Sequence, residues 1–317
     1  MKMRFTILSA FLILSGVASA DEGGVGFWLP GTYGSLAAIP AEPGWAFSLT
    51  YVHSDVSAEA HKTFKRGAKI VAGVDGRSDL IDVGPTYTLQ RPILGGRLSL
   101  SLLASGGKSK VNVGTSFANS NNNSHFQESS NVIGFGDLLP QATLAWSAGA
   151  HNVMTYVTGN IPVGKYDPDR LANLGLGYGA VDAGAGYTYF NPDSGYEASV
   201  VTGFTYSFEN PDTHYQNGID SHVDWGLSRF VSPQVHLGIV GYYYQQLTGD
   251  SGSGATLGSF KSRVAGVGPQ MGMFIPMSQT IQAYVNLKGY KEFAEQNRPD
   301  GWNMWLTLSL MPTSAEQ

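Results

Sequence analysis

The chain has no cysteine among its 317 residues, and its charged residues amount to only 14 % of the sequence. The absence of cysteine excludes disulfides and thiolate metal sites. Because an average soluble domain carries roughly 25 % charged residues, this chain has little charge with which to cover a water-exposed surface. The formal net charge of −5 and the absence of a basic stripe exclude nucleic acid as a partner.

Long apolar runs are also missing after the N-terminus, since no later stretch approaches the ~20 residues of a helical membrane span. Within the N-terminus, Lys2 and Arg4 precede a mostly apolar stretch at residues 5–14, and Ala18-Ser19-Ala20 follows as a small-residue cleavage site. This order predicts a secretory signal peptide over residues 1–20 rather than an apolar structural helix. Low charge without a hydrophobic helix leaves a membrane β-barrel or a soluble, glycine-rich all-β protein.

What the sequence does contain is a series of segments in which every second residue is apolar. The last of them reads GWNMWLTLSL at 301–310, with one face formed by Trp302, Met304, Leu306, Leu308 and Leu310. Twelve such segments follow one another from residue 45 onward, although the fifth, at about 151–161, alternates poorly. The pattern predicts about twelve β-strands.

The connections between these segments alternate in length. Short turns are expected at 90–96, 147–150, 191–195, 231–234 and 276–279. Longer loops are expected at about 54–79, 114–134, 164–177, 209–218, 248–260 and 291–301. Short turns at one end and long loops at the other are typical of a transmembrane antiparallel β-barrel of the outer membrane of a Gram-negative bacterium, with the turns in the periplasm.

The two faces of the predicted strands differ as a lipid-facing wall requires. The alternating apolar face carries no acidic residue, whereas the other face holds charged residues such as Asp182, Glu197 and Lys288. Aromatic residues gather near both ends of the strands, as in the girdles at membrane interfaces. We therefore expect membrane lipid and lipopolysaccharide as the neighbours of the apolar face.

Residues 21–43, DEGGVGFWLPGTYGSLAAIPAEP, precede the first predicted strand. Their glycine and proline content disfavours a regular element, and Phe27, Trp28 and Tyr33 disfavour plain disorder. The hypothesis is an N-terminal segment that folds into the lumen as a plug, ahead of a barrel over 44–310 and a periplasmic tail over 311–317.

Two sets of lumen-facing residues are candidates for contact with a solute. Asp220, His222 and Asp224 form one line, which indicates either a polar constriction, with His222 as a proton-sensitive group, or ordinary barrel lining. This line shows no diagnostic metal-ligand spacing. The second set offers aromatic faces to a flat apolar ligand, or simply fills the lumen. Its members are Tyr242, Tyr244, Tyr284 and Trp305.

Several short segments, in order along most of the chain, resemble a known family. They include LPG (29–31), GFGDLLP (134–140), NIPVGKYDP (160–168), NPDTHYQNG (210–218), GYYYQQLTGDSG (241–252) and EFAEQNRPDG (292–301). The chain is similar to the outer-membrane transporters associated with the meta-pathway of phenol degradation. The resemblance implies passive uptake of small hydrophobic or aromatic compounds, without a cofactor.

Two other functions remain open at the level of the sequence. One is a structural or adhesive barrel that transports nothing. The other is an outer-membrane hydrolase, which needs a nucleophile, a base and an orienting group close together. Ser221 and His222 are adjacent in sequence and so point to opposite faces of a strand, which disfavours the hydrolase. For uptake, the expected contact groups are the four aromatic residues, with His222 and Asp224 narrowing the path.

Overall fold

The computed structural model describes residues 26–66, 69–119, 122–256, 258 and 261–313. The predicted signal peptide over 1–20, the start of the N-terminal segment and the end of the predicted tail lie outside these residues. In the described part of the chain, twelve strands close into one antiparallel barrel in which each strand pairs with its neighbours in sequence. The transmembrane β-barrel predicted from the alternation is therefore confirmed.

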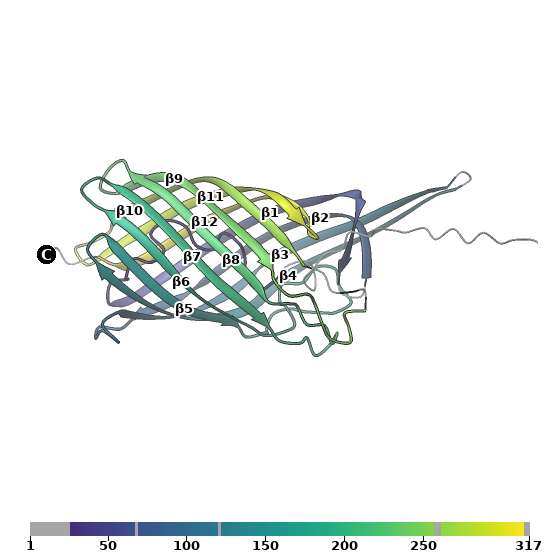
Figure 1. Cartoon of the computed structure of the whole chain (residues 1–317), viewed down its shortest axis with the longest axis horizontal. Helices are drawn as coiled ribbons and strands as arrows, with labels where there is room; N and C mark the ends of the chain where they lie inside the picture. Colours follow the sequence, from purple (N-terminus) through teal and green to yellow (C-terminus); the bar gives the residue numbers. More distant parts are fainter. Residues whose placement is uncertain (1–25, 67–68, 120–121, 257, 259–260, 314–317) are drawn as a thin grey trace, which may run out of the picture.

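The strands follow one another in chain order around the barrel (Figure 1). Their bounds are β1 (Gly44–Arg66), β2 (Lys69–Thr88), β3 (Arg97–Asn119), β4 (Asn122–Ala148), β5 (His151–Asn160), β6 (Ala180–Asn191), β7 (Tyr196–Ser207), β8 (Asp220–Phe230), β9 (Val235–Gln246), β10 (Arg263–Pro276), β11 (Ile281–Gln296) and β12 (Asp300–Pro312). The first and last strands close the barrel, with Phe47 opposite Leu310 and Ser57 opposite Asp300. Closure leaves no sheet edge in lipid, where unpaired backbone groups are costly.

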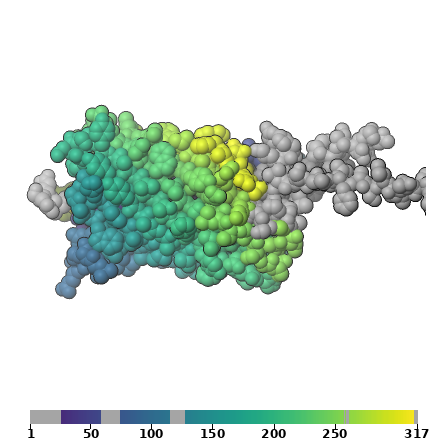
Figure 2. Space-filling view, viewed as in Figure 1, coloured from purple at the N-terminus to yellow at the C-terminus, as the bar shows by residue number. Residues whose placement is uncertain are grey.

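The apolar face of the strands lies on the outside of the barrel, and Figure 2 shows the continuous wall that they form. On β12, Trp302, Leu306, Leu308 and Leu310 are exposed, while Asn303 and Trp305 between them are buried in the lumen. On the other face, the charged residues Asp182, Glu197 and Lys288 are buried. The wall thus presents apolar side chains to lipid, and these three charges lie inside it.

Among the described residues, no helix is long and apolar enough to cross a membrane.

The first four strands are longer than the sequence predicted. Residues 54–79 and 114–134 were expected to be loops, but β1 and β2 pair as far as Arg66 and Lys69, and β3 and β4 as far as Asn119 and Asn122. The reason is that backbone hydrogen bonds between paired strands do not need an apolar face, so polar sequence can continue a hairpin into water. The β3–β4 hairpin projects from the long-loop end of the barrel (Figure 1).

Strand β5 explains why its sequence alternates poorly. Its exposure alternates cleanly, with Val153, Thr155 and Val157 outside. The residues between them, Met154 and Tyr156, are also large and are buried in the lumen. Because both faces carry apolar side chains, one towards lipid and one towards the lumen contents, the sequence loses its period of two.

Candidate functional site

The lumen of the barrel is occupied by residues 26–43 of the same chain, which contact side chains from several strands. Trp28 is 5 % exposed and Ala38 is fully buried. The amide of Leu36 donates to Glu197 on β7 at 2.9 Å, and the amide of Ala38 donates to Thr188 on β6 at 3.0 Å. These two amides do not pair with a neighbouring strand, so side chains of the lumen wall accept their hydrogen bonds instead.

A buried pair of opposite charges holds the turn at residues 31–33. The carboxylate of Asp224 on β8 accepts the amides of Gly31 and Tyr33 at 3.0 and 3.2 Å. From β11, the ammonium of Lys288 donates to the carbonyls of Gly31 and Thr32 at 2.6 and 3.0 Å. Asp224 therefore accepts hydrogen bonds from the amides of the turn, while Lys288 donates hydrogen bonds to its carbonyls.

The backbone at Gly31 has a conformation that favours glycine, with φ of +92°. A Cβ there would lie 3.0 Å from the ring of Tyr290 and 3.2 Å from that of Tyr242. Glycine at this position thus permits both the turn and its close approach to the wall.

Trp28 contacts a polar cluster on the lumen wall. Its indole stacks on the imidazole of His222, with 3.6 Å between ring centroids and 13° between planes. The Nε2 atom of His222 lies 3.2 Å from Asp182 Oδ2 and 3.1 Å from the hydroxyl of Tyr156. That hydroxyl donates to Asp182 Oδ1 at 2.7 Å. Strands β5, β6 and β8 thus build one flat surface for the indole.

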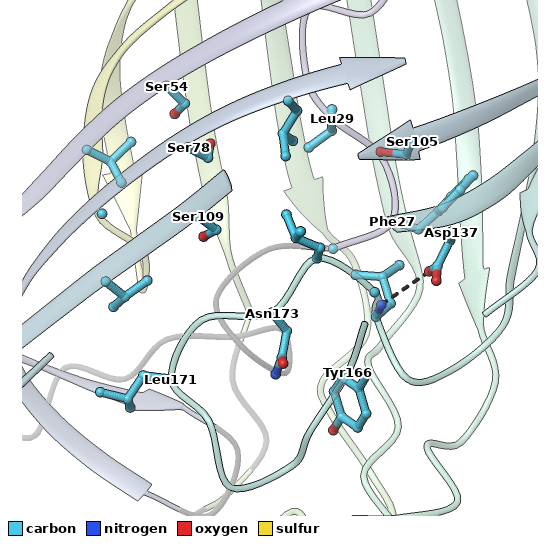
Figure 3. A pocket seen from close by; sticks show the side chains of 18 of the residues that line it. Phe27, Leu29, Ser54, Ser78, Ser105, Ser109, Asp137, Tyr166, Leu171 and Asn173 are labelled. Atoms are coloured by element: carbon cyan, nitrogen blue, oxygen red, sulfur yellow. Dashed lines mark hydrogen bonds between the residues drawn. The ribbon is translucent and has the colours of Figure 1, made fainter. Parts of the chain in front are cut away.

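A cavity of about 660 Å³ lies at the long-loop end of the barrel. Residues 26–30 line it together with strands β1, β2 and β3, the 166–176 loop and the ends of β11 and β12. Its apolar lining includes Phe27, Leu29, Val52, Leu80, Leu171 and Trp305, and its polar lining includes Ser54, Ser78, Ser109 and Asp137 (Figure 3). Charged side chains such as Glu292 and Arg298 line it as well. A cavity that combines apolar surface with polar groups suits a small organic molecule.

The loop between β5 and β6 folds inward and forms one wall of this cavity. Asp137 holds it, because Oδ1 accepts the amide of Gly164 at 2.9 Å and Oδ2 accepts the amide of Leu176 at 3.1 Å. Leu171 and Ala172 at the far side of the loop are buried in an apolar cluster with Val74, Val111, Val113 and Val132. A carboxylate and an apolar contact thus fix the loop at separate points.

Two further loops meet beside the cavity. The hydroxyl of Tyr215, a lining residue, donates to Asp250 Oδ2 at 2.5 Å. The other oxygen of Asp250 accepts the Gln246 side-chain amide at 2.6 Å and the Gly218 amide at 3.2 Å. Burial raises the pKa of the Asp250 carboxyl above its ordinary value, and these three hydrogen bonds oppose that effect.

The predicted contact residues divide into four groups in space. His222 and Asp224 bind the N-terminal segment, and Trp305 lines the cavity. Tyr242 and Tyr244 are buried side by side on β9, where Tyr242 donates to Glu292 at 2.8 Å. Tyr284 lies near the short-turn end, with its hydroxyl 3.0 Å from His236 Nε2. The cavity lining includes only Trp305 of these six residues.

Other residues of the site were not singled out from the sequence. Tyr156 and Lys288 bind the cluster and the turn, and the 166–176 loop closes one side of the cavity. The poor alternation of β5 signals Tyr156, because a large residue on the lumen face needs something to pack against. Nothing in the sequence around Lys288 reveals its partners, which lie more than 250 positions earlier in the chain.

A family model described as "Putative MetA-pathway of phenol degradation" matches residues 61–308. No curated protein matches the chain. Among solved structures, an outer membrane channel from Pseudomonas putida F1 is 17 % identical over 90 % of this chain and 100 % of that chain, with a TM-score of 0.67. A Pseudomonas aeruginosa FadL homologue is 11 % identical over 86 % of this chain and 75 % of that chain, with a TM-score of 0.41.

Proposed function

The chain belongs to this phenol-degradation family, and on that premise we propose that it is an outer-membrane channel for passive uptake of small hydrophobic or aromatic compounds. Its surroundings are membrane lipid and lipopolysaccharide. The sugar layer of the outer leaflet resists apolar solutes, and a barrel with an apolar entrance gives them a way around it.

The cavity at the long-loop end is the observation that carries this proposal. Its volume of about 660 Å³ falls within the roughly 300–1,000 Å³ typical of small-molecule sites. Trp305, Leu29 and Leu80 provide apolar contact area for a flat ring. A solute that enters between the long loops would meet this cavity first, with residues 26–30 as its inner boundary.

Residues 26–43 act as the plug in this proposal. Their contacts with Asp224, Lys288 and His222 support a closed resting state. Movement of the segment would uncover these groups together with Tyr242 and Tyr244, and Tyr284 would line the last part of the path. The six residues predicted from the sequence thus serve the solute after the plug moves, with Trp305 in contact before it.

Uptake in cells tests the proposal. Cells with the gene should accumulate radiolabelled toluene and phenol faster at low external concentration than cells without it. Cells that produce the protein with a filled cavity, through Ser78→Trp, should resemble cells without the gene, provided that outer-membrane levels are equal. Equal uptake in all three strains would contradict the proposal.

A second candidate function draws on the β3–β4 hairpin, which extends from the barrel to residues 119 and 122 (Figure 1). Such an arm suits a structural or adhesive barrel. Shortening the hairpin by removing residues 115–126 separates the two functions. Loss of cell attachment with normal solute uptake would favour adhesion, and unchanged attachment would leave uptake as the better account.

A further inference from the structure

Three serines form one continuous row on the cavity wall. Ser54 on β1 lies directly opposite Ser78 on β2, and Ser78 lies opposite Ser109 on β3. All three line the cavity, and Figure 3 shows them one after another on neighbouring strands. We call Ser54, Ser78 and Ser109 the serine band.

The serine band lies between two apolar rows of the same wall. On the side towards the long loops, Val56 and Val111 flank Gly76 in the register. On the side towards the plug, Val52 pairs with both Leu80 and Trp305. The wall therefore changes from apolar to polar and back to apolar over a distance of about 13 Å, since alternate residues on a strand are roughly 6.6 Å apart.

The hydroxyls of the serine band are available to a ligand. In the part of the chain that the structure describes, none of the three makes a side-chain hydrogen bond, whereas Ser105 in the next polar row bonds to Asp82. A hydroxyl can donate one hydrogen bond and accept others. A plain hydrocarbon would cover these groups and leave them unpaired, which costs free energy.

A second observation points to a ligand that donates hydrogen bonds. Glu292 at the end of β11 is 5 % exposed and lines the same cavity. One oxygen of its carboxylate accepts the hydroxyl of Tyr242, and the other has no hydrogen-bond partner among the described residues. Buried acceptors without a partner are rare in folded proteins. A ligand in the cavity that donates a hydrogen bond can supply the partner that this oxygen of Glu292 lacks.

From these contacts we propose that the cavity prefers hydroxyl-bearing aromatic solutes over plain aromatic hydrocarbons, and that the serine band determines this preference. The inference rests on the proposed uptake function and narrows its substrate class. The hydroxyl of the solute binds the serine band, while its ring lies against the apolar rows.

The test compares two ligands of similar size on the purified protein in detergent. 2-Phenylethanol carries a hydroxyl and ethylbenzene does not, and each is titrated to displace the fluorescent dye 1-N-phenylnaphthylamine. The triple variant Ser54→Ala, Ser78→Ala, Ser109→Ala should need about 3–10-fold more 2-phenylethanol, the loss expected for one neutral hydrogen bond. It should need the same amount of ethylbenzene, or less, so the ratio between the two ligands reports on the hydroxyl alone.

Ser57→Ala is the matched control, because Ser57 is an exposed serine on the outer face of β1. It should leave both displacement curves unchanged. If the triple variant fails to fold, the single variant Ser78→Ala, at the centre of the band, replaces it. It should change the ratio between the two ligands in the same direction but by a smaller factor. An unchanged ratio in the variants, with both ligands still bound, would overturn the hydroxyl preference and leave uptake standing. Failure of the unaltered protein to bind either ligand would overturn both.

Discussion

The indole of Trp28 stacks on the imidazole of His222 at 3.6 Å between ring centroids, inside the lumen of the barrel. One ring comes from the segment before the first strand, and the other comes from β8. The contact joins the proposed plug to the wall at the inner side of the cavity. Its strength therefore bears on whether the channel is open or closed.

Replacement of this indole should loosen the plug. Trp28→Ala removes a buried aromatic side chain, a change that costs about 3–5 kcal/mol in a packed core. We expect larger or more frequent conductance steps in a planar bilayer than for the unaltered protein. Trp302→Ala is the control, since Trp302 lies on the outer face and is 45 % exposed. Identical traces for Trp28→Ala and the control would count against this role.

The charge pair around Gly31 should show strong coupling. Lys288→Met removes the donor to the carbonyls of Gly31 and Thr32 and takes one positive charge away from the surroundings of the buried Asp224 carboxylate. A hydrogen bond to a charged group contributes about 1.5–3 kcal/mol. Residues 26–43 should then become accessible to protease. Adding Asp224→Asn should recover part of the protection, because the uncompensated charge is gone. Lys291→Met, on the exposed side of the same strand, serves as control. Additive effects of the two substitutions would rule out the pair as a unit.

The loop held by Asp137 should open when that carboxylate is removed. Asp137→Ala leaves the amides of Gly164 and Leu176 without their acceptor. A hydrogen bond to a charged group contributes about 1.5–3 kcal/mol, so the loss of one should raise the open population of the loop at least about tenfold. Trypsin should cleave after Arg170 faster by the same factor, because cleavage follows the open population. The control variant Asp193→Ala, which lies in a short turn, should be cleaved after Arg170 at the rate of the unaltered protein. Unchanged cleavage would show that the apolar cluster alone holds the loop.

A charge on the outer face should destabilise the barrel according to depth. Leu308 lies mid-strand, 44 % exposed, and pairs with Leu49 and Val285. Leu308→Arg should lower the free energy of unfolding in vesicles by about 2–4 kcal/mol, whereas Trp302→Arg near the strand end should cost roughly 0–1 kcal/mol. Equal losses from the two substitutions, measured by denaturant titration, would be inconsistent with lipid at the outer wall.

The loops joined through Asp250 should close more tightly at mildly acidic pH. Burial raises the pKa of this carboxyl in the folded loop above its ordinary value, which is about 3.9 when the loop opens. A raised pKa means that the closed loop binds the proton more tightly, so its stability is lost as the pH rises through that pKa. The hydrogen-exchange protection of the Gly218 amide should be higher at pH 5 than at pH 7. Protection that falls at pH 5 would contradict the expected sign.

The sequence predicts which strand residues face the lumen, but it does not predict what they contact there. The burial of His222, Asp224, Tyr242 and Tyr244 followed from a period of two, because alternate side chains of a strand share a face. Their partners did not follow, since Trp28 and Gly31 are about 190 positions away in the chain and no periodic pattern links them. The ends of β1 to β4 were misjudged for a related reason, because strand pairing beyond the membrane leaves no apolar trace.

By itself, the sequence determined the barrel. The alternation, the short turns and the low charge specify twelve strands with one face towards lipid, because each strand places its apolar side chains on one face through its own period of two. Only the tertiary structure decided what fills the barrel. Closure brings β1, β8, β11 and residues 26–43 around one lumen. Their contacts there create the hydrogen bonds of Asp224 and Lys288 to the turn at Gly31, the surface on which Trp28 stacks, and the serine band. Such contacts depend on which strands face each other across the lumen, and this is a property of the closed sheet rather than of any segment.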